Sequence, residues 1–373
     1  MTVLFNNYGR RSVHLVKGQG TEVWDDQGKR YLDFTSGIAV LSLGHANPLL
    51  NEALQQQSEK LWHVSNLFES PEQEQLGASL IKDTHLAHAL FCNSGAEANE
   101  AAIKLARKYT GKHHIITFEK SFHGRTYATM AATGQDKVKQ GFGPLVEKFT
   151  TIPFNDVQAL KEVADDSVGA IMLEVIQGEG GINAATPEFI EAINEVSAKY
   201  GIVVIVDEVQ TGIARTGKRY AFEHTALKPD IVSLAKGLGG GFPIGAILAK
   251  AQFFDTFGPG SHGTTFGGNP LAVAVAQKVV DTVFTPAFLE EVNELSTYAK
   301  QQLANKLPQC KVVGEGLLLG INSGAGTAAD YVKKAEQAGL LVVQAGTDVV
   351  RLVPPLNVTK QQIDEAITIL QQL

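Results

Sequence analysis

The feature that most constrains the fold is an uninterrupted apolar run that ends in a carboxylate. Residues Ile202 to Val206 are all β-branched, and Asp207 follows them directly. Because no polar residues alternate with them, the run predicts a strand buried on both faces, as in a parallel sheet covered by helices. Ligands bind such sheets at the carboxyl ends of the strands. Asp207 is therefore expected at a ligand-binding edge, where a poorly hydrated carboxylate needs a charged partner.

A second apolar run, Ile231 to Ala235, ends in a lysine. Lys236 is followed by the glycine-rich segment Gly237 to Gly241, which allows close backbone approach. Partial desolvation lowers the pKa of a lysine and leaves its amine more nucleophilic. Lys236 is thus a candidate Schiff-base amine. The alternative is a purely structural ion pair with Asp207.

Nucleotide-binding and hydrolase motifs are absent or incomplete. Gly212 to Arg219 falls one residue short of a phosphate-binding GxxxxGK[ST] loop, because Arg219 has no hydroxyl for magnesium and no apolar helix follows. The segment from Gly237 lacks the third glycine of GxGxxG, since position 242 is Phe. No GxSxG, HExxH or EF-hand pattern occurs.

Composition excludes several classes of partner. The chain of 373 residues has a formal net charge of −7 and no basic cluster, so we expect no nucleic-acid partner. No apolar run reaches the length of a membrane span, and the first residues do not form a secretory leader. The two cysteines, Cys92 and Cys310, form no CxxC pair, so we expect no disulfide framework and no metal. A cytoplasmic protein in a reducing compartment is predicted.

The remaining pattern alternates strands and helices. A helix over 187–200 is expected to begin after Thr186 as its N-cap and to stop at Gly201. Such alternation predicts an α/β protein with a mostly parallel sheet and one functional edge. The other predicted strands are 87–92, 114–118 and 168–173, and the other predicted helices are 96–109, two within 47–82, of which the second opens at Ser70-Pro71, and one or two within 271–304.

The chain ends predict a smaller unit. Short alternating segments around Asp26-Gln-Gly28 predict a hairpin, and residues 310–373 predict a small α+β unit. We expect an N-terminal arm over 1–45 that belongs to the small domain. The large domain is expected over 46–270, and a connecting helix with the C-terminal small domain over 271–373.

Polar residues follow several predicted strands. The backbone N–H groups of Ser94-Gly95-Ala96, at the start of a helix, suit a phosphate, although an ordinary N-cap is the alternative reading. In Phe122-His-Gly-Arg125 the aromatic ring could stack on a planar ligand and the arginine could bind a carboxylate, unless the segment is a turn with a solvated arginine. Further candidates are Gln177-Gly-Glu179-Gly-Gly181, the hydroxyl-rich loop Ser261 to Pro270, and Arg351.

Together these segments resemble the class III, or ω-amino acid, aminotransferases, which use pyridoxal 5′-phosphate on the type I aminotransferase fold. The resemblance covers nearly the whole chain. It implies a large domain with a mostly parallel sheet and a small α+β domain built from the N-terminal arm and the C-terminal part. It rests on motifs that are weak singly and specific in this order: Ser-Gly-Ala before a helix, Phe-His-Gly-Arg, Gln-Gly-Glu-Gly-Gly, Asp-Glu-Val-Gln, Ala-Lys-Gly and Thr-Thr-Phe-Gly-Gly-Asn-Pro.

The resemblance implies roles in cofactor binding. Lys236 would bond to the cofactor and later shuttle a proton, and Asp207 would pair with the pyridinium nitrogen so that the ring can accept electrons. Phe122 would stack on the ring and Gln210 would face its hydroxyl. Ser94, Gly95 and Ala96 would surround the phosphate, and Thr265 would reach the phosphate of the neighbouring subunit in a homodimer. Ala96 departs from the threonine of many relatives, which removes a hydroxyl from the phosphate site and leaves the backbone donors.

The resemblance also implies substrate contacts. Arg125 would bind a substrate carboxylate, Arg351 the α-carboxylate of glutamate or 2-oxoglutarate, and Thr264 the substrate. Glu179 would pair with Arg351 while an ω-amine is bound and then move aside, since an unpaired arginine in a dry pocket is costly. The implied reaction converts N2-acetylornithine and 2-oxoglutarate to N-acetylglutamate 5-semialdehyde and glutamate, a step of arginine biosynthesis. Ornithine, succinylornithine or 4-aminobutyrate as donor, and an isomerase or racemase on the same scaffold, are the alternatives.

Overall fold

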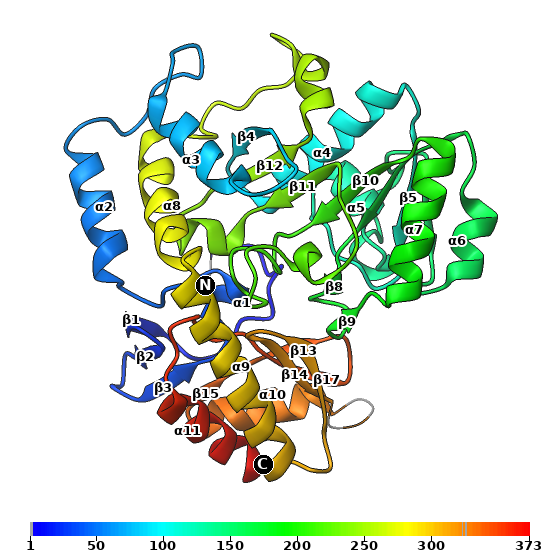
Figure 1. Ribbon diagram of the computed structural model, residues 1–373. Helices are drawn as coiled ribbons and strands as arrows, with labels where there is room; N and C mark the ends of the chain where they lie inside the picture. Colours follow the sequence, from blue (N-terminus) through cyan, green and yellow to red (C-terminus); the bar gives the residue numbers. More distant parts are fainter. Residues whose placement is uncertain (1–2, 323, 325–326) are drawn as a thin grey trace.

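The computed structural model describes residues 3–322, 324 and 327–373. Met1 and Thr2, at the start of the expected arm, lie outside the described residues. Within this part of the chain, one large sheet has the strand order β4-β12-β11-β10-β7-β5-β6 (Figure 1). Its strands are β4 (His88–Cys92), β5 (His114–Phe118), β6 (Phe149–Ile152), β7 (Val168–Leu173), β10 (Val203–Asp207), β11 (Ile231–Leu234) and β12 (Gly245–Ala249).

The large sheet is mostly parallel, as predicted. β10 pairs in parallel with β7 and β11, and β5 pairs in parallel with β6 and β7. The exception is β12, which runs antiparallel to both β11 and β4. The carboxyl ends of β5, β7, β10 and β11 therefore meet at one edge, where the predicted functional residues lie.

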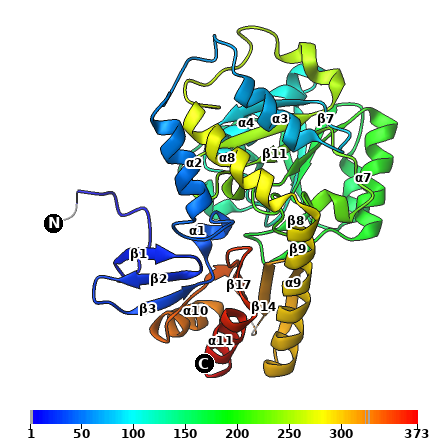
Figure 2. The same ribbon diagram turned by 60° about the vertical axis from the view of Figure 1, so that its left-hand side comes forward.

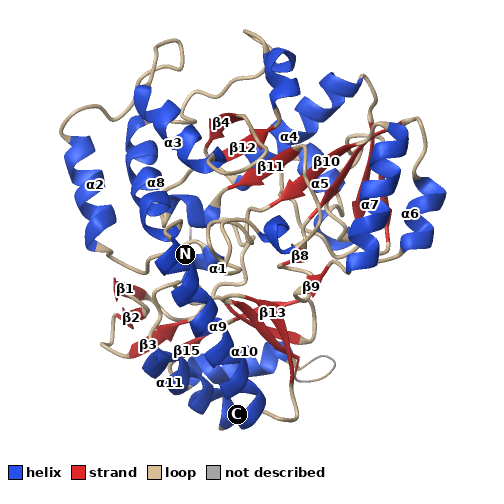
Figure 3. Cartoon of the chain, in the orientation of Figure 1, coloured by secondary structure: helices blue, strands red, loops and turns tan. Residues whose placement is uncertain are grey.

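Helices cover both faces of this sheet (Figures 1 and 3). On one face, Val203 and Ile205 of β10 pack in a cluster with the buried side of α4 (Gly95–Thr110). On the other, Val204 and Val206 pack in a cluster with α7 (Pro187–Tyr200) and α8 (Pro270–Val283). The other helices of this region are α2 (Pro48–Ser58), α3 (Pro71–Ile81), α5 (Tyr127–Ala132) and α6 (Val157–Val163). This double cover explains why β10 is apolar throughout.

Several predicted helix ends are confirmed. The Thr186 hydroxyl accepts the N–H of Phe189 at the start of α7, and Gly201 ends that helix with φ 65°. Ser70 caps α3 by accepting the N–H of Gln73. A left-handed residue at a helix end satisfies carbonyls that lack an intrahelical donor, and glycine adopts this conformation without strain.

A smaller α+β unit joins the two ends of the chain (Figure 2). The hairpin strands β1 (Leu15–Gln19), β2 (Glu22–Asp25) and β3 (Arg30–Asp33) form a sheet with β15 (Leu340–Leu341), in which Leu340 lies beside Leu32. A separate sheet has the order β13-β14-β17-β16. The remaining elements are α1 (Ser36–Ala39), β8 (Ile176–Gln177), β9 (Asn183–Ala184), α9 (Pro286–Lys306), β13 (Lys311–Glu315), β14 (Leu318–Asn322), α10 (Ala328–Gln337), β16 (Val343–Ala345), β17 (Val349–Leu352) and α11 (Lys360–Gln371).

Among the described residues, no helix is by itself long and apolar enough to cross a membrane. Within the described part of the chain, α8 and α9 would be long and apolar enough only if taken together, and this pair is bent by 70°.

Candidate active site

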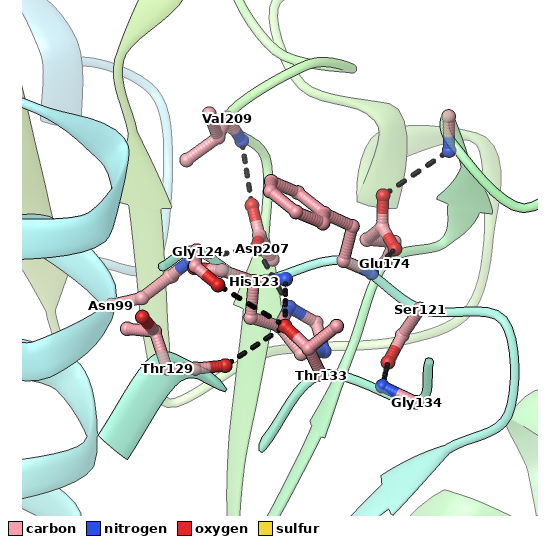
Figure 4. A network of polar contacts seen from close by, with 12 residues as sticks. Asn99, Ser121, His123, Gly124, Thr129, Thr133, Gly134, Glu174, Asp207 and Val209 are labelled. Atoms are coloured by element: carbon pink, nitrogen blue, oxygen red, sulfur yellow. Dashed lines mark hydrogen bonds and ion pairs between the residues drawn. The ribbon is translucent and has the colours of Figure 1, made fainter. Parts of the chain in front are cut away.

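Asp207 lies at the end of β10, on the face of the sheet that α4 covers. Its Oδ2 accepts hydrogen bonds from His123 Nδ1 at 2.8 Å and from Asn99 Nδ2 at 2.8 Å, and its Oδ1 accepts the N–H of Val209 at 2.9 Å (Figure 4). The carboxylate is 3% exposed. Three N–H donors, from the His123 ring, the Asn99 amide and the Val209 backbone, thus fix the carboxylate at the sheet edge.

Neither His123 nor Asn99 was singled out from the sequence. Asn99 lies one turn after Gly95 on α4, and its amide also donates to the carbonyl of His123 at 2.7 Å. The His123 N–H donates to Thr133 Oγ1 at 3.0 Å. The backbone of His123 is thus held on both sides, and Asp207, as a carboxylate, can only accept a hydrogen bond from the ring Nδ1.

Lys236 begins a 3-10 turn, Lys236–Gly239, just beyond the end of β11. Its backbone φ is +41°, a region that residues with side chains adopt rarely and mostly at functional sites. Burial lowers the pKa of Lys236, and the negative charge of Glu179 partly opposes this effect. The amine therefore loses its proton more readily than an exposed lysine, which suits a nucleophile.

These residues share one cavity of about 420 Å³. The predicted residues that line it are Ser94, Gly95, Ala96, Phe122, Arg125, Glu179, Asp207, Gln210 and Lys236. Within the described part of the chain, Arg351, Thr264 and Thr265 are not among the lining residues. The Thr264 hydroxyl accepts a hydrogen bond from Asn93, a residue of the cavity wall, at 3.1 Å. The side chain of Thr265 is exposed.

The start of α4 provides free N–H groups at the cavity wall. The Ser94 hydroxyl accepts the N–H of Glu97 at 3.2 Å, so the N-cap reading is also correct. The N–H groups of Gly95 and Ala96 have no acceptor within the helix. A side chain is excluded at position 95, because a Cβ there would lie 2.8 Å from Val209 Cγ1. Backbone N–H groups at a helix N-terminus suit a phosphate.

Arg351, on β17, is paired with Glu179 at the rim of the cavity. Its Nη1 lies 2.6 Å from Glu179 Oε1, and its Nη2 lies 3.2 Å from Glu179 Oε2. Nη1 also donates to Gln210 Oε1 at 2.7 Å and to the carbonyl of Gly178 at 2.9 Å. Burial alone would raise the pKa of Glu179, but the charge and hydrogen bonds of Arg351, together with Lys236 and Gln210, lower the pKa below its usual value.

Arg125 and Phe122 stand at the two ends of the Phe122-His-Gly-Arg125 motif, and their side chains lie close together. The Arg125 guanidinium is 5.5 Å from the centre of the Phe122 ring. Arg125 is exposed to solvent in this structure, whereas Phe122 is half-buried. The pair leaves a charged group at the cavity mouth and an aromatic face inside it.

Glu174, which directly follows β7, is a further buried carboxyl group of the cavity. Burial raises its pKa to about 7, with a smaller upward effect from Asp207 and an opposing effect from His123. Its oxygens accept the N–H groups of Phe122 and Gly178, each at 3.1 Å.

A buried lysine, a carboxylate fixed by three donors and a helix start with free N–H groups meet in one cavity, an arrangement that suits an enzyme of the aminotransferase type. The family model described as Aminotransferase class-III matches residues 5–373, and the chain belongs to this family. The predicted family is thus confirmed.

Individual relatives are similar over the full chain. The acetylornithine aminotransferase of Bacillus subtilis is 50% identical over 376 residues, covering 100% of this chain and 97% of the relative. That of Halalkalibacterium halodurans is 51% identical over 377 residues, covering 100% of this chain and 98% of the relative.

Solved structures confirm the type I aminotransferase fold. An N-acetylornithine aminotransferase from Stenotrophomonas maltophilia superposes with a TM-score of 0.85 at 38% identity, over 98% of this chain and 96% of that one. An ornithine aminotransferase from Toxoplasma gondii gives a TM-score of 0.93 at 32% identity, over 99% of this chain and 91% of that one. The latter is described as having partial occupancy of PLP at its active site.

Proposed function

We propose that this enzyme transfers the terminal amino group of N2-acetylornithine to 2-oxoglutarate, with pyridoxal 5′-phosphate as cofactor. The products are N-acetylglutamate 5-semialdehyde and glutamate, and the reaction belongs to arginine biosynthesis. The observation that carries the proposal is that Lys236, Asp207 and Glu179 line one cavity and that Arg351 is paired with Glu179. The names of the relatives that match the full chain support the choice of donor.

The residues of the cavity fit the cofactor. Asp207 is a fixed acceptor for a protonated ring nitrogen, and Phe122 offers an aromatic face for the ring. The N–H groups of Gly95 and Ala96 suit the phosphate, and Lys236 would hold the cofactor through its amine. Pyridoxal phosphate, when bound, supplies an electron sink that stabilises negative charge at the substrate carbon.

The protein groups divide the remaining work. The Lys236 amine, once free, holds and moves the proton at the reacting carbon of the substrate. Arg125 at the cavity mouth binds a substrate carboxylate. Glu179 neutralises Arg351 while an ω-amine is bound and uncovers it for 2-oxoglutarate, because one site must accept substrates of different charge. Gln210 would face the ring hydroxyl of the cofactor, and it already contacts both Arg351 and Glu179.

We also propose a homodimer in which Thr265 reaches the phosphate site of the neighbouring subunit and Thr264 contacts substrate. Thr265 is next to Phe266, whose exposed ring packs against His63 with centroids 5.2 Å apart. The 61–68 segment is tied to this loop, since Asn66 Nδ2 donates to the carbonyl of Gly267 at 2.9 Å. Its exposed apolar side chains are Leu61, Trp62, Leu67 and Phe68. A contiguous exposed apolar surface is typical of an interaction site.

We propose that the enzyme works in the cytoplasm. Cys92 and Cys310 are both free and buried, which accords with a reducing compartment.

The donor is tested by following the visible absorbance of the purified enzyme loaded with cofactor. N-acetylornithine, ornithine and 4-aminobutyrate are added separately, followed by 2-oxoglutarate. We expect N-acetylornithine to bleach the cofactor band fastest and 2-oxoglutarate to restore it. If only another amine bleaches the band, the proposed mechanism is retained and N-acetylornithine is the wrong donor.

Ornithine is the second candidate donor, because the ornithine aminotransferase of Toxoplasma gondii superposes with the higher TM-score, 0.93 against 0.85. The same titration separates the two amines. A band that an amine changes but 2-oxoglutarate does not restore would point instead to an isomerase or racemase.

A further inference from the structure

Glu174 is a buried carboxyl group that none of the roles above uses. It follows β7 directly, lines the cavity and is 5% exposed. Its Oε2 accepts the N–H of Phe122 and its Oε1 accepts the N–H of Gly178, each at 3.1 Å (Figure 4). One side chain thus joins two backbone segments, at Phe122 and Gly178, that are 56 residues apart in the sequence.

Each of these segments carries part of the site. The first contains Phe122, which offers its ring to the cavity, and His123, which holds Asp207 at 2.8 Å. The second contains Gly178 and Glu179. Any shift of Glu174 would therefore change the ring-binding part of the site and the part that binds the dicarboxylate.

Gly178 connects Glu174 to Arg351. Its N–H, in the peptide group shared with Gln177, is held by Glu174, and its carbonyl, in the peptide group shared with Glu179, accepts Arg351 Nη1 at 2.9 Å. The position has no room for a side chain, since a Cβ on Gly178 would lie 2.5 Å from Gln210 Cδ. Gln210 Oε1 accepts Arg351 Nη1 at 2.7 Å.

This arrangement keeps Arg351 oriented without Glu179. When Glu179 moves aside, Nη1 retains its hydrogen bonds to the Gly178 carbonyl and to Gln210. A guanidinium that is already held loses little conformational entropy when a carboxylate binds. The orientation of the peptide at Gly178 then decides where the guanidinium points.

We infer that Glu174 is a positioning residue, whose carboxylate fixes the Phe122 segment and, through the backbone of Gly178, orients Arg351 for the dicarboxylate substrate. The inference rests on the proposed function, because it takes Arg351 as the group that binds 2-oxoglutarate.

Glu174→Gln tests this role with almost no change in volume. A glutamine has one carbonyl oxygen and one NH₂ group, so it cannot accept both backbone N–H groups. The matched control is Glu208→Gln. Glu208 is equally buried, but it accepts the N–H of Phe222 and the hydroxyl of Thr211, and this hydroxyl can instead accept a hydrogen bond from an amide. Among the described residues Glu208 is not part of the cavity wall.

Two measurements on the cofactor-loaded enzymes read out the effect, at about pH 8, where Glu174 with its pKa of about 7 is ionised. The first is the dissociation constant of glutarate, a dicarboxylate that cannot accept an amino group. The second is the rate and substrate dependence of each half-reaction, followed separately. For Glu174→Gln we expect the dissociation constant of glutarate and the KM for 2-oxoglutarate to rise about tenfold. The amine half-reaction should slow by less than about threefold, because it loses only the support of the Phe122 segment, and Glu208→Gln should match wild type.

The inference is overturned if Glu174→Gln binds glutarate as wild type does, or if both variants weaken equally. Wild-type enzyme that transfers no amino group from any of the amines would refute the proposed function itself. If Glu174→Gln does not fold, Glu174→Asp replaces it, because a shorter carboxylate cannot span both N–H groups. The same weakening of glutarate binding is then expected, and wild-type affinity again contradicts the inference.

Discussion

Arg351 is the most constrained charge of the site. It is 1% exposed, and both terminal nitrogens are bound to Glu179. We predict that Arg351→Ala slows the 2-oxoglutarate half-reaction at least about a hundredfold, while the ω-amine half-reaction changes by less than about tenfold. The reason is that, in the proposed function, only the dicarboxylate binds to the guanidinium. The two half-reactions are measured separately by cofactor absorbance.

Arg351→Lys serves as the control for charge. A lysine keeps the positive charge but loses the bidentate geometry, so an intermediate effect on the 2-oxoglutarate half-reaction is expected. Equal losses in both half-reactions of Arg351→Ala would refute the assignment of Arg351 to the dicarboxylate.

At the scale of single residues, the sequence predicted those site residues that a local sequence pattern marks. Asp207 was predictable because it ends a continuous β-branched run, and Lys236 because it ends a similar run before glycines. His123 and Asn99 were not singled out, since nothing local distinguishes a histidine within a turn or an asparagine within a helix. Their contacts with Asp207 arise only when the loop after β5 and the helix α4 meet the carboxyl end of β10 in the folded chain.

Among the elements, α7 is the one whose boundaries were most fully predicted. Thr186 caps its start and Gly201 ends it in the left-handed conformation. We predict that Thr186→Ala lowers the free energy of unfolding by about 1 kcal/mol, because the N–H of Phe189 loses its acceptor. Denaturant unfolding followed by circular dichroism measures the loss.

The control for this cap is Thr186→Ser, which retains the hydroxyl and should unfold as wild type does. Transaminase activity should be unchanged in both variants, since α7 packs on the sheet away from the cavity wall. An unaltered unfolding midpoint in Thr186→Ala would show that the cap contributes nothing.

The sheet was predictable in class but not in every strand. Apolar runs without alternation indicated parallel strands at β5, β7, β10 and β11. The antiparallel direction of β12 was not predicted, because an apolar run carries no information about the direction of its strand. In addition, no α-helix separates β12 from β11. That strand places Gly245 beside Cys92, at the edge of the cavity.

On the scale of the whole molecule, the two chain ends pair with each other, and the C-terminal part also contacts the site. β15 from the C-terminal part extends the N-terminal hairpin sheet, and Arg351 on β17 contacts Glu179 of the cavity wall. The division at residues 45 and 270 stays a prediction. That the N-terminal arm and the C-terminal part share one small domain was predicted from the resemblance to a family and not from any local sequence pattern.

The proposed homodimer is tested at Phe266, which is 60% exposed. We predict that Phe266→Asp shifts the enzyme towards monomer in analytical ultracentrifugation, because a charge would be buried in the interface. Cofactor affinity should fall with it, since Thr265 would no longer reach the neighbouring phosphate site. The control is Tyr109→Asp, which changes an exposed ring on α4. A Phe266→Asp protein with the mass and cofactor affinity of wild type would rule out this interface.

The central claim is that Lys236 carries the chemistry of an aminotransferase. Its most direct test is the steady-state transfer of the amino group from N-acetylornithine to 2-oxoglutarate by Lys236→Ala, beside Lys199→Ala as a control on the exposed side of α7. We predict that Lys236→Ala loses at least about a thousandfold in kcat, while Lys199→Ala keeps wild-type activity. Turnover by Lys236→Ala at the wild-type rate would contradict the account.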